Sequence, residues 1–218
     1  MNPVLRTIES LDWMTLSLVL SLLLLTIGKY LFQTKFLNFL ILPFNNKYLV
    51  LSTKKGRLLS WFHIFMTLFQ FINLPLFVFL IKKTWEGSSS QITLQLFFVF
   101  IALAIFFHSL KILAQLLKGY VFNTQELVWD LIYNKTTYLN YSSLVMFISN
   151  VILIYMLNDS KTVIYIALGF IFLINAIGLI RLVKNHQKVI VHYLFYFILY
   201  LCALEIAPLV VIGSYLKG

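Results

Sequence analysis

The stretch WMTLSLVLSLLLLTIGKYLF, residues 13–32, decides what kind of fold this chain can adopt. Its polar groups are hydroxyls plus Lys29 near its end, and it contains no acidic residue. An α-helix rises about 1.5 Å per residue, so about 20 apolar residues cross the hydrocarbon layer of a bilayer, which is roughly 30 Å thick. The stretch therefore predicts a transmembrane helix.

The composition extends this prediction to the whole chain. Of its 218 residues, 61% are hydrophobic and only 11% are charged, and the mean hydropathy is +0.92. An ordinary globular domain carries about 25% charged residues. A soluble fold would have too little polar surface to cover so many apolar side chains, whereas lipid accepts them directly. We expect an all-α, polytopic transmembrane bundle forming a single domain over residues 1–218.

Apolar segments of suitable length recur along the chain, and they predict about six spans. These lie near residues 13–32, 58–81, 92–113, 141–157, 162–182 and 189–216. Two more polar segments, 34–57 and 123–138, are predicted to lie along the membrane surface as interfacial amphipathic segments. Pro43 interrupts the first, and Asn123 with Glu126 three residues later has the spacing of a helix N-cap in the second.

Basic residues predict the orientation, because Lys and Arg concentrate in cytoplasmic loops. With six spans, one side of the membrane holds Arg6, Lys82, Lys83, Lys161 and Lys217, and the other side holds the remaining twelve of the 17. Both termini should therefore face away from the cytoplasm. The net charge of +10 is explained by loops beside anionic lipid headgroups, so no nucleic-acid partner is expected.

Three segments resemble a known family: FNNKYLVLS (44–52), FFHSLKILAQLLKGYVFN (106–123) and HYLFYFILYLCALEIAPLVVI (192–212). They are similar to small multi-pass inner-membrane proteins of Bacteroidetes grouped as domain of unknown function 4271. The resemblance covers nearly the whole chain, and LYLCALEIAPL is its most specific part. It implies a bacterial inner-membrane location, with both termini periplasmic by the charge argument, and it implies no activity. A role beside type IX secretion follows only from the distribution of that lineage.

Glu205 is the one acidic residue deep inside an apolar segment. An ionisable group at that depth costs about 3 kcal/mol on insertion scales and usually faces protein or water. Pro208 has no N–H for the carbonyl of Leu204, so a polar notch is expected beside the carboxyl. Glu205 is either the titrating group of a proton or cation site, or a protonated carboxyl that holds the bundle together through a hydrogen bond.

Depth along the helices suggests the partners of Glu205. Counted at about 1.5 Å per residue, Asn73 and Gln70 reach a similar level and Asn150 comes within about two turns. Asn73 is the preferred candidate for the partner of Glu205. Pro75, two residues later, predicts a second helix break.

Histidines and basic residues form two further candidate sites. His63, His108 and His192 lie at similar depths and could in principle bind a metal or haem iron, but no pair shares a helix at a ligand spacing, so no metal or other cofactor is predicted. A basic belt is predicted at the cytoplasmic side, either as a solvated set of charges or as a phosphate or lipid-headgroup pocket. Its members are Lys54, Lys55, Arg57, Arg181, Lys184 and Lys188.

Span 162–182 carries Gly169 and Ala176 on one face, which predicts a close helix contact there.

Three hypotheses about function remain open. Hydrolase, zinc-protease and P-loop motifs are missing from the sequence, which favours a non-enzymatic subunit or accessory factor of a cell-envelope complex, with other membrane proteins as partners. The alternative is a small proton-linked transporter that uses Glu205, Asn73 and the breaks at Pro75 and Pro208. An enzyme acting on a lipid-linked substrate ranks last.

Overall fold

The computed structural model describes residues 12–43, 60–86, 94–121 and 125–185, and within these ranges every regular element is a helix. The elements are α1 (Asp12–Leu31), α2 (Gln33–Leu40), α4 (Trp61–Glu86), α5 (Leu94–Val121), α6 (Gln125–Val151), the π-helical turn η1 (Ile152–Met156) and α7 (Lys161–Asn185). Five helices in the described part are long and apolar enough to cross a membrane. The predicted class, an all-α transmembrane bundle, is confirmed.

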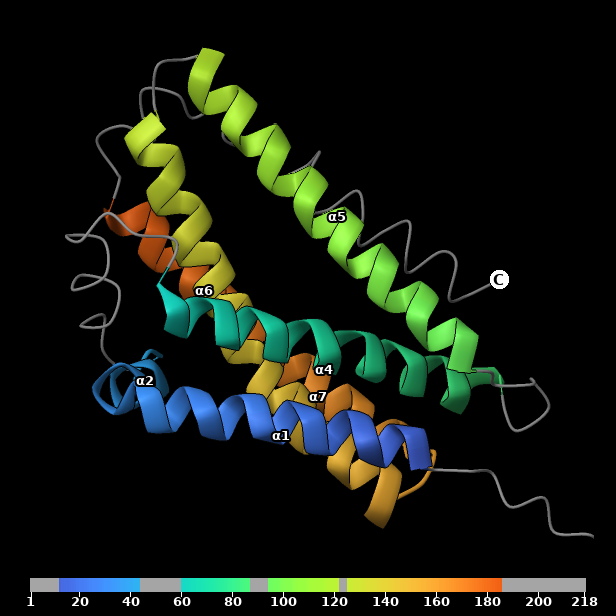
Figure 1. Cartoon of the computed structure of the whole chain (residues 1–218). Coiled ribbons are helices and arrows are strands. Elements are labelled where there is room, and N and C mark those ends of the chain that lie inside the picture. The colour runs from blue at the N-terminus through green and yellow to red at the C-terminus, as the bar shows by residue number, and fades with distance from the viewer. Residues whose placement is uncertain (1–11, 44–59, 87–93, 122–124, 186–218) are drawn as a thin grey trace, which may run out of the picture.

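The helices α1, α4, α5 and α7 overlap the spans expected at 13–32, 58–81, 92–113 and 162–182. The span expected at 189–216 lies outside the described residues. Figure 1 shows α1 and α4 running side by side, with α6 and α7 crossing behind them and α5 on the far side of α4 from α1.

The segment 123–138 differs from its prediction as a separate surface helix. It forms the first half of α6, which continues without interruption to Val151, and the candidate span covers Val128–Met156. Ile132, Tyr133 and Tyr138 are buried, and α6 packs against both α4 and α7. The segment 123–138 is therefore not a separate helix but the first half of α6, and its apolar side chains pack into the bundle.

Local hydrogen bonds explain how so polar a segment enters the bundle. The hydroxyl of Thr136 donates to the carbonyl of Ile132 at 2.8 Å, and that of Thr137 donates to the carbonyl of Tyr133 at 2.7 Å. A threonine that bonds back to its own helix needs neither water nor another helix. The polar composition of the segment therefore does not exclude it from the bundle.

The short helix α2 occupies the first part of the predicted surface segment 34–57. Its Phe36 and Phe39 are buried, and their rings pack edge to face on Phe62 of α4 at centroid distances of 6.4 Å and 5.7 Å. One amphipathic segment thus docks against the bundle. Residues 44–57 lie outside the described part of the chain.

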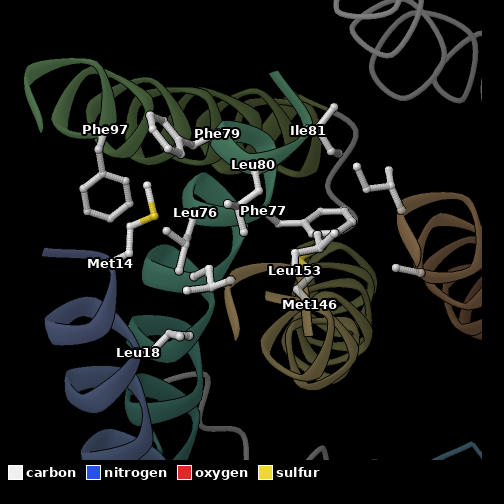
Figure 2. Close-up of a cluster of buried hydrophobic side chains, with 13 residues drawn as sticks. Met14, Leu18, Leu76, Phe77, Phe79, Leu80, Ile81, Phe97, Met146 and Leu153 are labelled. Carbon is white, nitrogen blue, oxygen red and sulfur yellow. The ribbon is translucent and has the colours of Figure 1, made fainter. Parts of the chain in front are cut away.

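The main apolar core lies where α1, α4 and α5 meet the end of α6, η1 and the start of α7 (Figure 2). Trp13 of α1 contacts Phe79 of α4 and Phe97 of α5, each at a centroid distance of 5.1 Å. Leu76 and Ile164 are fully buried in the same cluster. This contact ties the first three long helices together at one end of the bundle.

Candidate functional site

A polar seam runs between α4 and α6 inside the bundle. The side-chain Nδ2 of Asn150 donates to the backbone carbonyl of Asn73 at 3.1 Å. Further along, Nδ2 of Asn140 donates to the hydroxyl of Thr67, also at 3.1 Å. All three asparagines are fully buried. The seam therefore joins two transmembrane helices through amide groups in an otherwise apolar contact.

The amide nitrogens of Asn73, Asn140 and Asn150 donate hydrogen bonds, whereas several amide oxygens of the seam accept none from the described residues. Nδ2 of Asn73 donates to the carbonyl of Phe69 at 2.9 Å, while none of the described residues donates to the Oδ1 atom of Asn73. The same holds for the side-chain oxygens of Gln70, Asn134, Asn140 and Asn150. A buried polar atom without a partner costs about 1–3 kcal/mol. A proton donor, a water or a cation would remove that cost.

Pro75 adds another acceptor near Asn73. It lies inside α4, which continues as a helix from Trp61 to Glu86. The proline has no N–H to donate to the carbonyl of Phe71, four residues earlier. The predicted break at Pro75 is therefore a missing hydrogen bond within a continuous helix. Glu205 and Pro208 lie outside the described residues.

The structure thus brings together two of the predicted site residues, Asn73 and Asn150. The side-chain oxygen of Gln70, one turn before Asn73, is also buried and receives no hydrogen bond from the described residues. The sequence prediction missed Asn140. A detectable signal existed, because Asn140, Ser143 and Asn150 follow the i, i+3, i+10 spacing of one helix face and are all fully buried.

A separate polar contact joins α6 to α7. Nδ2 of Asn175 donates both to the hydroxyl of Ser142 in α6 at 3.0 Å and to the carbonyl of Ile171 at 2.8 Å. The Ser142 hydroxyl in turn donates to the carbonyl of Tyr138 at 3.0 Å. Polar contacts therefore connect α6 to helices on both of its sides.

Arg181 of α7 holds the end of α2 against the bundle. One guanidinium nitrogen donates to the carbonyl of Leu42 at 2.6 Å and to the Tyr138 hydroxyl at 3.1 Å, and the other donates to the carbonyl of Pro43 at 2.6 Å. The planar fork of arginine suits such multiple contacts.

Arg181 therefore differs from a solvated charge, which was one of the two alternatives for the predicted basic belt. Lys184, one turn further along α7, is exposed, as a belt residue would be. Lys54, Lys55, Arg57 and Lys188 lie outside the described residues.

The two described histidines are packed against aromatic rings. The ring of His63 in α4 lies 5.0 Å from that of Tyr133 in α6, and His108 in α5 meets Phe71 of α4 edge to face at 5.4 Å. Among the described residues, no three His, Cys, Asp or Glu side chains are placed to hold a metal ion. His192 lies outside that part of the chain.

Long apolar helices joined by a buried amide seam define the class of protein as a polytopic helical membrane protein. The family described as Domain of unknown function (DUF4271) matches residues 14–216, and the chain belongs to that family. No curated protein matches the chain. No solved structure matches it either.

Proposed function

We propose that this membrane protein binds a proton donor or small cation at the α4–α6 seam and works as a small proton-linked carrier. The observation that supports this proposal is the set of buried amide oxygens of Gln70, Asn73 and Asn150 that receive no hydrogen bond from the described residues. Asn73 lies twelve residues from the start of α4 and thirteen from its end, close to the middle of the helix. Transporters place their coupling sites at this depth.

Glu205 is the proton-carrying group in this proposal. It is the one acidic residue in the apolar segment 189–216. A protonated carboxyl donates one hydrogen bond, which an amide oxygen of the seam can accept, and the ionised form cannot donate. Loss of the proton from Glu205 would therefore break the hydrogen bond between its carboxyl group and the amide oxygen of the seam.

The first prediction concerns proton movement in proteoliposomes that contain a pH-sensitive dye and carry an imposed membrane potential. Replacing Glu205→Gln should reduce proton entry to the level of empty liposomes, while Glu205→Asp should retain part of it because it keeps a titratable group. Asn73→Leu should also reduce it by removing the acceptor. Asn175→Ala is the matched control, since it removes a partly buried amide whose hydrogen bonds lie on the α7 side of α6. A Glu205→Gln variant as active as the unmodified protein would exclude this mechanism.

A second candidate function is that of a non-enzymatic subunit or accessory factor in a cell-envelope complex of a bacterial inner membrane. It is favoured by α5, the least buried of the five candidate spans. Large apolar side chains at helical spacing form an exposed stripe along it: Val99, Leu103, Phe106, Leu110, Leu113 and Leu117. Lipid tails and the apolar face of a partner helix have similar polarity, so either could cover this stripe. A measurement of direct contact distinguishes the two.

Photo-crosslinking in native membranes provides the second prediction. A photoreactive residue at Phe106, which is exposed, should form an adduct with another membrane protein, whereas one at Phe97, which is buried between α1 and α4, should not. Mass spectrometry of the adduct would identify the partner and would test a link with type IX secretion. Adducts to lipid or to this chain alone at Phe106 would remove the subunit hypothesis.

A further inference from the structure

Two neighbouring helices depart from the regular α-helical hydrogen-bond pattern inside the bundle. In α4, Pro75 has no N–H to donate to the carbonyl four residues earlier. The α-helix α6 ends at Val151 and continues as the π-helical turn η1, in which the N–H of Leu157 donates to the carbonyl of Ile152 at 2.8 Å. Prolines and π-helical turns are the usual places where helices bend. Both helices therefore contain a point at which bending costs little.

A hydrogen bond between α4 and α6 places the two irregularities at one level. Nδ2 of Asn150 donates to the backbone carbonyl of Asn73 at 3.1 Å. Pro75 comes two residues after Asn73, and η1 begins two residues after Asn150. At about 1.5 Å per residue, each irregularity lies about 3 Å beyond the residue that bonds to the other helix. We call Pro75, η1 and the bond between the two asparagines the paired break.

The buried apolar side chains form two separate clusters, one on each side of the paired break. The main apolar core includes Leu76 and Phe77 of α4 and Leu153 of η1, which follow the break, and Met146 of α6 just before it (Figure 2). A second core cluster uses parts of α4 and α6 that precede the break. Its members from these two helices are Phe62, Met66, Tyr133 and Tyr138. The bundle is therefore packed as two units that meet near the paired break.

Each unit is held together by contacts between several helices. Beyond the break, the hydroxyl of Tyr155 donates to Oγ1 of Thr15 in α1 at 2.8 Å. Trp85 of α4 meets Tyr165 of α7 edge to face at 6.0 Å. On the other side of the break, Arg181 joins α2, α6 and α7. The continuous helices α1 and α7 contribute to both clusters, which limits any relative motion to a rocking of the two units.

The amide seam lies at the boundary between these units. The side-chain oxygens of Gln70, Asn73 and Asn150 are buried there and accept no hydrogen bond from the described residues. Rocking of one unit on the other would change the separation of α4 and α6 at these oxygens. Transporters combine interrupted helices near the middle of the membrane with rocking of one bundle of helices against another. The paired break thus lies where a moving part could control access to the seam.

We propose that the paired break is a hinge that opens and closes the amide seam toward the end of the bundle at which α4 ends and α7 begins. Bending at Pro75 and η1 moves the main apolar core relative to the second core cluster. The bond between Asn150 and Asn73 couples the two bends, so α4 and α6 bend together. The role of the hinge in access rests on the proposed carrier function, whereas the coupled bending itself is measured without any cargo.

Hydrogen–deuterium exchange of the full-length protein in nanodiscs measures this bending, because a backbone amide exchanges when its hydrogen bond opens. Pro75→Ala adds an N–H that can donate to the carbonyl of Phe71, and alanine suits a helix interior. Exchange at residues 72–78 should become about tenfold slower, the effect of one backbone hydrogen bond. Exchange at residues 152–157, which are unchanged, should become about twofold slower or more through the coupling. Val78→Ala is the matched control, because it shortens a side chain of α4 without adding a backbone donor.

A second pair of variants tests whether the asparagine bond carries the coupling. In a protein that carries Asn150→Leu, which removes the bond and keeps the side-chain size, Pro75→Ala should slow exchange at 72–78 but not at 152–157. In a protein that carries Asn140→Leu, which removes the contact with Thr67 outside the paired break, Pro75→Ala should slow both. The hinge would be overturned if exchange at 152–157 ignored Pro75→Ala, or if it responded equally to Val78→Ala. Those two comparisons need neither asparagine variant.

Proton entry into proteoliposomes tests the access role separately. Pro75→Ala should slow proton entry several-fold because the hinge is stiffer, whereas Glu205→Gln should abolish it. Unchanged proton entry in Pro75→Ala would overturn the access role. Absence of proton entry in the unmodified protein would overturn the proposed carrier function instead, and the exchange experiment would still decide whether the two helices bend together.

Discussion

Replacing Arg181→Met is expected to destabilise the protein by about 3 kcal/mol or more, because hydrogen bonds to a charged group contribute about 1.5–3 kcal/mol each. The guanidinium donates to the carbonyls of Leu42 and Pro43 and to the Tyr138 hydroxyl. Leu42 is fully buried, so water does not easily replace the lost donor. The variant should also release the end of α2 from α7.

Thermal or denaturant unfolding in one fixed detergent measures this change. Lys184→Met is the control, because it removes an exposed positive charge one turn further along α7 and should leave the unfolding midpoint nearly unchanged. Proteolysis near residues 41–43 should become faster in Arg181→Met alone. Equal midpoints for the two variants would show that Arg181 is a solvated charge after all.

Replacing Gly178→Ala is expected to destabilise the bundle by about 1–3 kcal/mol, the usual cost of overpacking a core. A Cβ atom at Gly178 would lie 2.6 Å from Cγ and 2.7 Å from Cδ2 of Tyr138. The Tyr138 ring is rigid and only 2% exposed, so α6 and α7 would have to move apart. That movement would also disturb the bond between Arg181 and Tyr138.

Gly169→Ala is the matched control on the same helix. A Cβ atom there has nothing within 4 Å, and alanine favours a helix over glycine by about 1 kcal/mol. The control should therefore be neutral or stabilising. In a protein that already carries Tyr138→Ala, the further substitution Gly178→Ala should lower the free energy of unfolding much less than it does in the unmodified protein. A penalty independent of Tyr138 would contradict the proposed clash.

The two glycines of α7 show a feature that the sequence alone does not predict, namely which of them makes a close helix contact. The pattern of small residues predicted a close helix contact at Gly169 and Ala176, but nothing lies within 4 Å of a Cβ at Gly169, and the glycine in close contact is Gly178. Both glycines lie in the same apolar helix, and nothing local distinguishes them. The distinction depends on Tyr138, forty residues earlier, because the ring of a neighbouring helix determines which glycine is needed.

The segment 123–138 joins α6 instead of forming a helix of its own for a related reason. The segment was predicted to lie at the surface because its polar side chains were assumed to need water as a hydrogen-bond partner. Thr136 and Thr137 instead donate to their own helix, and Ile132 and Tyr133 pack inward. A count of polar residues does not reveal whether a hydroxyl has already found an acceptor.

The candidate polar site was partly predictable. Asn73 and Gln70 were identified because, counted at about 1.5 Å per residue, they lie at a depth similar to that of Glu205. Asn140 was not identified, because its partner, the hydroxyl of Thr67, lies on a different helix. Their contact depends on how α4 and α6 pack against each other.

The sequence by itself determined that this chain crosses a membrane through apolar helices, because the width of the hydrocarbon layer and the cost of unpaired backbone groups leave no other solution for such segments. Only the tertiary structure decided which polar groups meet: the amide of Asn150 with the backbone of Asn73, Arg181 with the end of α2, and Asn175 with Ser142. The physical reason is that lipid-facing and helix-facing side chains have the same polarity in a membrane. Partner choice then depends on shape and on directed hydrogen bonds, which arise only when the helices pack.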